Sequence, residues 1–218
     1  MSKVLYIHGM GGGGDSRIPS ILQECFSCCQ ERDVTVFART YSFDPETAAG
    51  QIASWVEELR PDVVIGESLG ALQALRVRGV PLLFVSPALN TPIYFEILSW
   101  LVLIPGVTWI FDRIYRPREG DRQKLHFTHK VLRKYMPHRR LALLNTPQTV
   151  IHAFFGTRDH YRRSGIVSVR TWKKYFGQTY TMYDGTHYME EEYVRSLLVE
   201  TICKILKMRQ YNKRVTYG

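Results

Sequence analysis

The sequence lacks the features of a membrane-spanning or secreted chain. Its most apolar stretch, residues 97–111, has no charged residue, but it is interrupted by Pro105 and Gly106 and falls short of the roughly 20 residues that a membrane-spanning helix needs. The apolar run near the start is too short for the hydrophobic region of a signal peptide. We therefore expect a cytoplasmic protein.

Cysteine is scarce and unevenly placed. Cys25, Cys28 and Cys29 lie close together and Cys203 lies far away, unlike the even framework of a disulfide-stapled domain. No second Cys or His pair follows at the spacing of a zinc site. We expect reduced thiols, partly buried on a helix, and the sequence predicts neither a metal site nor a cofactor.

Acidic residues are fewer than basic ones, 20 against 29, which gives a net charge of +9. Residues 112–140 contain ten Lys or Arg and three acids, so most of this excess lies there. Hydrophobic residues at 45% and charged residues at 22% exclude a disordered, collagen-like or coiled-coil chain. The length of 218 residues predicts a single domain over residues 1–218.

Short runs rich in Val, Ile, Phe and Tyr alternate with helical patterns. The expected strands are residues 4–8, 34–41, 63–66, 82–86, 149–155 and 179–183. Asp44 and Pro45 have the residue types of a helix start, and an apolar stripe over residues 193–206 predicts a final helix. Strand alternating with helix predicts an α/β protein with a mostly parallel sheet of about six strands.

Residues 91–145 break this alternation. The segment joins an apolar, aromatic stretch to the basic one, and prolines divide it. We expect a helical cap insertion over one end of the sheet.

The third expected strand leads directly into Gly66-Glu67-Ser68-Leu69-Gly70, and a helical pattern follows. In a G-x-S-x-G turn between strand and helix, a strained serine projects from the carboxyl end of the sheet. Glycines flank it because a side chain there would collide with the neighbouring strand and helix. Ser68 is the candidate nucleophile.

A nucleophilic serine needs a base and an acid that orients the base, each placed after a later strand. His187 follows the sixth expected strand and Asp159 follows the fifth. Asp184, which is close to His187 in sequence, is a second candidate for the acid.

The glycine-rich loop after the first strand allows two interpretations. Residues 9–14, from Gly9 to Gly14, can present backbone N–H groups to an oxyanion, because no side chains stand in the way. They also satisfy the G-x-G-x-x-G dinucleotide pattern, with Arg39 available for a 2′-phosphate. The nucleotide interpretation leaves Ser68, Asp159 and His187 unexplained.

Together with the His8-Gly9 loop, these three residues resemble the α/β-hydrolase family, its small bacterial serine esterases in particular. The resemblance implies an α/β-hydrolase fold with oxyanion donors at the N–H groups of Leu69 and Met10. Because the chain begins at the strand that carries His8 and Gly9, we expect the family's leading strands to be missing.

We therefore predict a serine hydrolase that cleaves a carboxylic ester or thioester of a small acyl substrate through a Ser-His-Asp triad and an acyl-enzyme intermediate. The alternative is a non-catalytic or nucleotide-binding protein that uses the glycine loop. Trp100, Trp109 and Phe111 would roof the serine and line an acyl pocket. The basic stretch suggests an anionic substrate or transient contact of the cap with anionic lipid, and nucleic acid is the less favoured partner.

Overall fold

The computed structural model describes residues 1–28, 33–116, 119–144 and 150–217, with side chains up to residue 209. Cys29, Arg118, Asn145 and Thr149, which belong to segments discussed above, lie outside the described residues. In the described part of the chain, no helix is both long and apolar enough to cross a bilayer.

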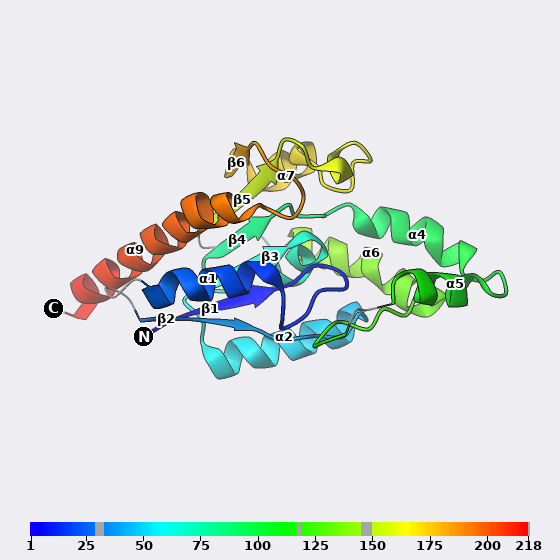
Figure 1. Cartoon of the computed structure of the whole chain (residues 1–218), viewed down its shortest axis with the longest axis horizontal. Helices are drawn as coiled ribbons and strands as arrows, with labels where there is room; N and C mark the ends of the chain where they lie inside the picture. Colours follow the sequence, from blue (N-terminus) through cyan, green and yellow to red (C-terminus); the bar gives the residue numbers. More distant parts are fainter. Residues whose placement is uncertain (29–32, 117–118, 145–149, 218) are drawn as a thin grey trace.

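A single sheet of six strands forms the centre of the molecule (Figure 1). The strands are β1 (Ser2–Ile7), β2 (Val34–Ala38), β3 (Val63–Glu67), β4 (Leu82–Val85), β5 (Ile151–Gly156) and β6 (Tyr180–Tyr183). Their order is β2-β1-β3-β4-β5-β6, and every neighbouring pair is parallel. The predicted six-stranded parallel sheet is confirmed.

Helices cover both faces of this sheet. One face packs against α1 (Arg17–Cys28) and α9 (Val199–Tyr217). The other packs against α2 (Pro45–Leu59), α3 (Ala71–Ala74), α6 (His129–Leu144) and α7 (Val169–Phe176). Along β1, Val4 and Tyr6 pack on the face that α1 and α9 cover, and Leu5 and Ile7 pack on the opposite face, because successive side chains of a strand point to opposite sides of the sheet. Both faces are therefore apolar, as a buried parallel sheet requires.

The predicted helix starts follow from local chemistry. The Asp44 carboxylate accepts the backbone N–H groups of Glu46 and Thr47, each at 3.1 Å, and Pro45 occupies the first turn of α2. At the other end of the chain, α8 (Glu191–Tyr193) passes through a π-helical turn, η3 (Val194–Leu198), into α9. The predicted stripe there buries Val194, Leu198, Ile202, Ile205 and Leu206.

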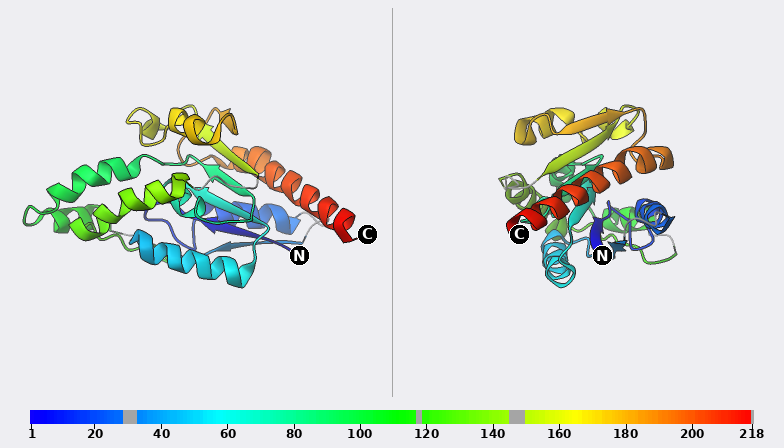
Figure 2. Two further views of the ribbon diagram at one scale, coloured as in Figure 1. Left: turned by 180° about the vertical axis from the view of Figure 1, so that it is seen from behind. Right: turned by 90° about the vertical axis from the view of Figure 1, so that its left-hand side faces the viewer.

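The segment expected as an insertion is helical, but its parts differ in position. α4 (Thr91–Leu101) and α5 (Val107–Ile114) project beyond the carboxyl ends of the strands, opposite to the C-terminus (Figures 1 and 2). α6 instead packs against α2 and α3, because Leu132, Tyr135 and Ala142 point into the core. Thus α6 belongs to the helical layer over the sheet, and α4 and α5 form the projecting part.

His138 on α6 makes folding stability dependent on pH. Burial, together with the Arg76 guanidinium 3.0 Å from Nδ1, lowers the pKa of His138 to about 4. Between that value and the ordinary histidine pKa of about 6.5, only the unfolded chain takes up the proton. Stability is therefore fully present above about pH 6.5 and is lost as the pH falls towards 4.

We expect His138 to contribute a slope of up to about 1.4 kcal/mol per pH unit between about pH 6 and 4.5. Urea unfolding at several pH values should show a steeper loss of stability for the wild type than for His138→Gln. Equal slopes would contradict the assignment, whatever the absolute stability of the variant.

Candidate active site

Ser68 occupies a strained turn between β3 and α3. It begins a short 3-10 helix, η1 (Ser68–Gly70), and has a left-handed φ of 49°, which is unfavourable for a residue with a side chain. A Cβ at Gly70 would lie 2.3 Å from the carbonyl oxygen of His8, and one at Gly66 would lie 2.7 Å from Cβ of Ala74. The predicted reason for the two glycines, collision with the neighbouring strand and helix, is confirmed.

Three residues that are distant in sequence form a chain of hydrogen bonds at this turn. Ser68 Oγ lies 2.9 Å from His187 Nε2, and His187 Nδ1 lies 2.8 Å from Asp159 Oδ2. His187 follows β6, Asp159 follows β5, and each is only 3% exposed. The second carboxylate oxygen of Asp159 accepts the backbone N–H of Tyr161 at 2.8 Å, which fixes the orientation of the carboxylate.

Asp184, the other candidate for the acid, has different partners. Its carboxylate is exposed, lies 3.0 Å from Arg158 Nε and accepts the Thr157 hydroxyl at 3.1 Å. The carboxylate that contacts His187 is that of Asp159.

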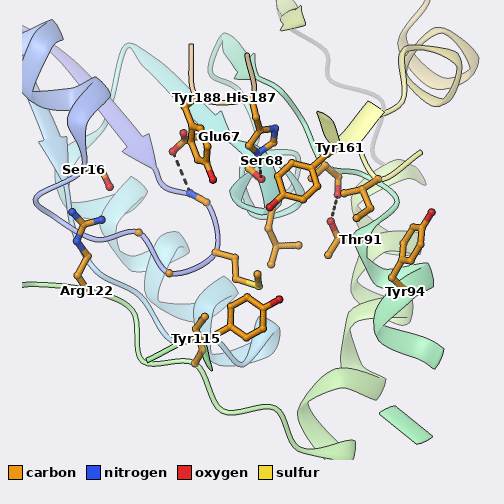
Figure 3. A pocket seen from close by; sticks show the side chains of 18 of the residues that line it. Ser16, Glu67, Ser68, Thr91, Tyr94, Tyr115, Arg122, Tyr161, His187 and Tyr188 are labelled. Atoms are coloured by element: carbon orange, nitrogen blue, oxygen red, sulfur yellow. Dashed lines mark hydrogen bonds between the residues drawn. The ribbon is translucent and has the colours of Figure 1, made fainter. Parts of the chain in front are cut away.

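Two tyrosines enclose the imidazole of His187. The rings of Tyr161 and Tyr188 meet it edge to face, with centroids 4.6 and 5.3 Å away (Figure 3). They restrict rotation of the imidazole about its bond to the chain. Neither tyrosine was predicted from the sequence, although Tyr188 directly follows His187 and Tyr161 follows Asp159 by two residues.

A cavity of about 870 Å³ opens above Ser68 and His187 (Figure 3). Met10 and Leu69 line it, as does the loop that begins at Gly9. Its outer wall consists of apolar and aromatic side chains, namely Tyr94, Phe95, Ile114, Tyr115, Leu125 and Ile166. Arg17, Arg116 and Arg122 also line the cavity, so its lining is mixed, and α4 and the end of α5 contribute apolar side chains to it.

Trp100, Trp109 and Phe111 are not among the residues that line this cavity, so the predicted acyl-pocket residues must be corrected. Trp100 and Trp109 are 59% and 64% exposed, and Phe111 packs on Phe127 with ring centroids 5.6 Å apart. Residues 97–111 contain no charged residue, so the sequence of this stretch does not indicate which side faces the serine.

The glycine run packs against a segment that is distant in sequence. Residues 120–125, here called the return segment, lead from α5 towards α6. A Cβ at Gly13 would lie 1.6 Å from the carbonyl oxygen of Asp121. Gln123 is only 2% exposed. Its side-chain oxygen accepts the Gly11 N–H at 3.1 Å, and its backbone N–H donates to the Gly12 carbonyl at 2.7 Å. Protein packing thus accounts for glycines that the dinucleotide interpretation assigned to a phosphate.

Arg39, the candidate for a 2′-phosphate, makes a two-point ion pair with Glu58 at 2.6 and 2.7 Å. His8 is buried, stacks on Tyr41 at 4.2 Å and places Nδ1 2.8 Å from the Gly9 carbonyl oxygen. Burial lowers the pKa of His8 to about 4, so it supports the loop as a neutral imidazole at neutral pH. Among the described residues, no three His, Cys, Asp or Glu side chains gather as a metal site.

The chain is similar to known proteins in structure and not in sequence. No model of a known protein family matches the sequence, and no curated protein matches it either. Monoacylglycerol lipase from Paleococcus ferrophilus aligns with a TM-score of 0.61 at 18% identity, covering 93% of this chain and 94% of that one. Est1E from Butyrivibrio proteoclasticus, solved with ferulic acid, aligns with a TM-score of 0.56 at 15% identity, covering 93% and 90%.

The bottromycin epimerase BotH aligns with a TM-score of 0.55 at 11% identity, covering 94% of this chain and 90% of that one. These similarities, with the parallel sheet and the turn at Ser68, show that the chain has the α/β-hydrolase fold. The fold implied by the sequence resemblance is confirmed. Since the same fold carries both lipases and an epimerase, function must be argued from the site.

Two glycine variants test the packing of the return segment. Gly13→Ala places a Cβ against Asp121, and we expect a loss of about 1–3 kcal/mol in the free energy of unfolding. Gly50→Ala in α2 is the matched control, because a Cβ there meets nothing within 4 Å and alanine favours the helix by about 0.5–1 kcal/mol. Urea unfolding measures both, and equal stability of the two variants would argue against the contact.

Proposed function

We propose that this protein is a serine hydrolase that cleaves a carboxylic ester or thioester of an acyl substrate. The observation that carries this proposal is the hydrogen-bonded chain from Ser68 through His187 to Asp159 at the base of the cavity. A serine, a histidine and a buried carboxylate in this order have the geometry of nucleophile, base and orienting acid.

In the proposed reaction, His187 Nε2 takes the hydroxyl proton as Ser68 Oγ attacks the acyl carbon. The tetrahedral intermediate collapses when His187 donates that proton to the leaving alcohol or thiol, which leaves an acyl group on Ser68. Water, activated by His187, then releases the acid and restores the serine. Asp159 holds the proton of His187 on Nδ1, so that Nε2 is free to act as the base.

The N–H groups of Met10 and Leu69 are the proposed donors to the oxyanion. Both residues line the cavity beside Ser68. A Cβ at Gly9 would lie 3.0 Å from Cβ of Ser68 and 3.6 Å from its Oγ, so the glycine loop runs directly alongside the nucleophile. Backbone donors in a loop beside the nucleophile suit a charge that develops on the acyl oxygen.

The cavity supports an acyl substrate. A volume of about 870 Å³ with a largely apolar outer wall is of the size and character of small-molecule sites. A monoacylglycerol lipase shares this fold, so the fold is compatible with ester hydrolysis, and the hydrogen-bonded Ser68, His187 and Asp159 favour hydrolysis over other reactions of the fold. The nucleotide-binding alternative loses support, because its glycines and Arg39 are engaged with Asp121, Gln123 and Glu58.

The basic stretch does not favour a nucleic-acid partner. Several of its cations bind within the protein: Arg122 pairs with Asp15 at 2.8 Å, Lys134 with Asp44 at 2.6 Å, and Arg139 donates to the Leu89 carbonyl. Side chains held in this way are not arranged as a continuous phosphate-binding surface.

A fluorophosphonate probe should modify Ser68 and no other serine. Ser68→Ala and His187→Ala should abolish labelling and reduce p-nitrophenyl acetate hydrolysis about 10³-fold or more. Ser86 is a matched control, since it also ends a strand with a positive φ of 44° and is buried, and Ser86→Ala should still be labelled. Undiminished hydrolysis in Ser68→Ala would refute the mechanism.

Replacing each of the two aspartates by asparagine separates their roles. Asp159→Asn should lower kcat by about 10³- to 10⁴-fold, because an amide favours the wrong tautomer of His187. Asp184→Asn should change kcat little, because Asp184 pairs with Arg158 on the surface. Steady-state kinetics on the same ester measures both, and the reverse order of effects would transfer the orienting role to Asp184.

A further inference from the structure

The projecting helices α4 and α5 carry an unusually exposed apolar surface. Ile97, Trp100, Ile104, Trp109, Ile110 and Ile114 are each between 47% and 67% exposed, and these six residues define the cap surface. No residue of α5 is fully buried. An apolar patch of this kind on a soluble domain marks an interaction site, because leaving it in water is unfavourable.

The residues of the cap surface stay exposed although α4 packs along α6. On α4 the buried residues include Phe95 and Ser99, on the side that packs along α6. The exposed residues lie on the remaining sides of a helix pair that projects past the end of the sheet (Figures 1 and 2). The cap surface can therefore contact a broad planar partner without obstruction by the sheet and the helices that cover it.

Cations accompany the exposed indoles. The Arg113 guanidinium lies 5.6 Å from the ring centre of Trp109, and that of Arg133 lies 5.8 Å from Trp100. Arg116 and Lys130 are also exposed nearby in the chain. Indoles mixed with cations are typical of the boundary between lipid tails and headgroups, where the rings reach the acyl region and the cations reach the phosphates.

The acids of α4 and α5 cancel part of this charge. Glu96 pairs with Arg133, and the Asp112 carboxylate lies 2.5 Å from His126 Nδ1 and accepts the Phe127 N–H at 3.1 Å. Glu96 thus neutralises Arg133, and Arg113, Arg116 and Lys130 supply the remaining positive charge beside the cap surface. The cap surface combines apolar side chains with net positive charge, which is complementary to an anionic lipid surface.

The cavity opens onto this surface. Tyr94, Ile114 and Tyr115 line the cavity and are also 40%, 67% and 43% exposed. Figure 3 shows Tyr94 and Tyr115 among the side chains that line it. An acyl chain that leaves a bilayer under α4 and α5 could contact Phe95, Ile114 and Tyr115 in this cavity, and Arg116 and Arg122, which also line it, could contact a polar headgroup.

We propose that the cap surface docks the protein on anionic lipid bilayers and that the substrate is an acyl ester of an amphiphile taken from that bilayer. Docking depends only on the surface, whereas the identity of the substrate rests on the hydrolase function proposed above. A second copy of the chain is the main competing occupant. The cation and indole pairs favour a phosphate-bearing surface over a copy that carries the same positive charge.

Vesicle binding tests docking separately from catalysis. Ser68→Ala protein, which cannot consume lipid, should sediment with phosphatidylglycerol-containing phosphatidylcholine vesicles and much less with phosphatidylcholine alone. Added salt should release it, as exposed charges are screened. Brominated acyl chains should quench the tryptophan fluorescence, because Trp100 and Trp109 enter the acyl region.

Two pairs of variants locate the contact. Trp100→Ser with Trp109→Ser should lower vesicle binding at least tenfold, while Tyr175→Ser, which changes an exposed aromatic residue on α7, should not. Arg113→Gln and Lys130→Gln should each lower it about fivefold, while Lys207→Gln on α9, at the opposite end of the molecule, should have little effect. The charge variants keep the test valid if the tryptophan variant folds poorly.

Three results would overturn the docking proposal: no vesicle binding, equal binding by all variants, or dimerisation through the cap surface in sedimentation velocity without vesicle binding.

The substrate is tested with the double tryptophan variant. It should hydrolyse a vesicle-borne acyl ester at least tenfold more slowly than the wild type, and p-nitrophenyl acetate in buffer at the wild-type rate. Equal rates on the vesicle-borne ester would overturn delivery from the bilayer. Failure of the wild type to hydrolyse p-nitrophenyl acetate would count against the hydrolase function alone.

Discussion

Backbone segments approach one another around Ser68 more closely than side chains would permit, and the rest of the site depends on this approach. Gly70 lies against the end of β1, Gly66 against α3, and Gly9 against Ser68 itself. These contacts exist because β1 and β3 are neighbours in the sheet, so their carboxyl ends open side by side. The pairing of β5 with β6 brings the loops of Asp159 and His187 together in the same way. Strand order therefore assembles the site, and glycine allows it to close.

Much of this arrangement could be predicted from the sequence, because it depends on signals that are local. Six apolar runs, the turn around Ser68 and the positions of Asp159 and His187 after strands each need only a few neighbouring residues to be recognised. The sequence could not decide between Asp159 and Asp184, since both precede His187 in suitable loops. That choice depends on the ion pair that Arg158 offers to Asp184, which is a property of the folded loop.

The predictions that were wrong or ambiguous depend on contacts between segments that are distant in sequence. Trp100, Trp109 and Phe111 lie in a stretch without charged residues to mark its outer side, so periodicity could not show which residues face the cavity. The glycine run had an ambiguous meaning because its packing partner, Asp121, lies more than a hundred residues away. The same distance concealed Gln123, whose side chain also donates to the carbonyl groups of Tyr41 and Ser42.

The return segment divides the molecule into parts with different freedom to change. Residues 120–125 attach to the loop beside Ser68 through Gly11, Gly12 and Gly13, whereas α4 and α5 meet that loop mainly across the open cavity. Helices of other length or composition could therefore replace α4 and α5, provided that the return segment keeps its register on the glycines. The return segment is therefore a suitable junction for engineered chimeras. Chimeras joined before residue 120 would exchange the surface and the cavity wall while leaving the support of the nucleophile intact.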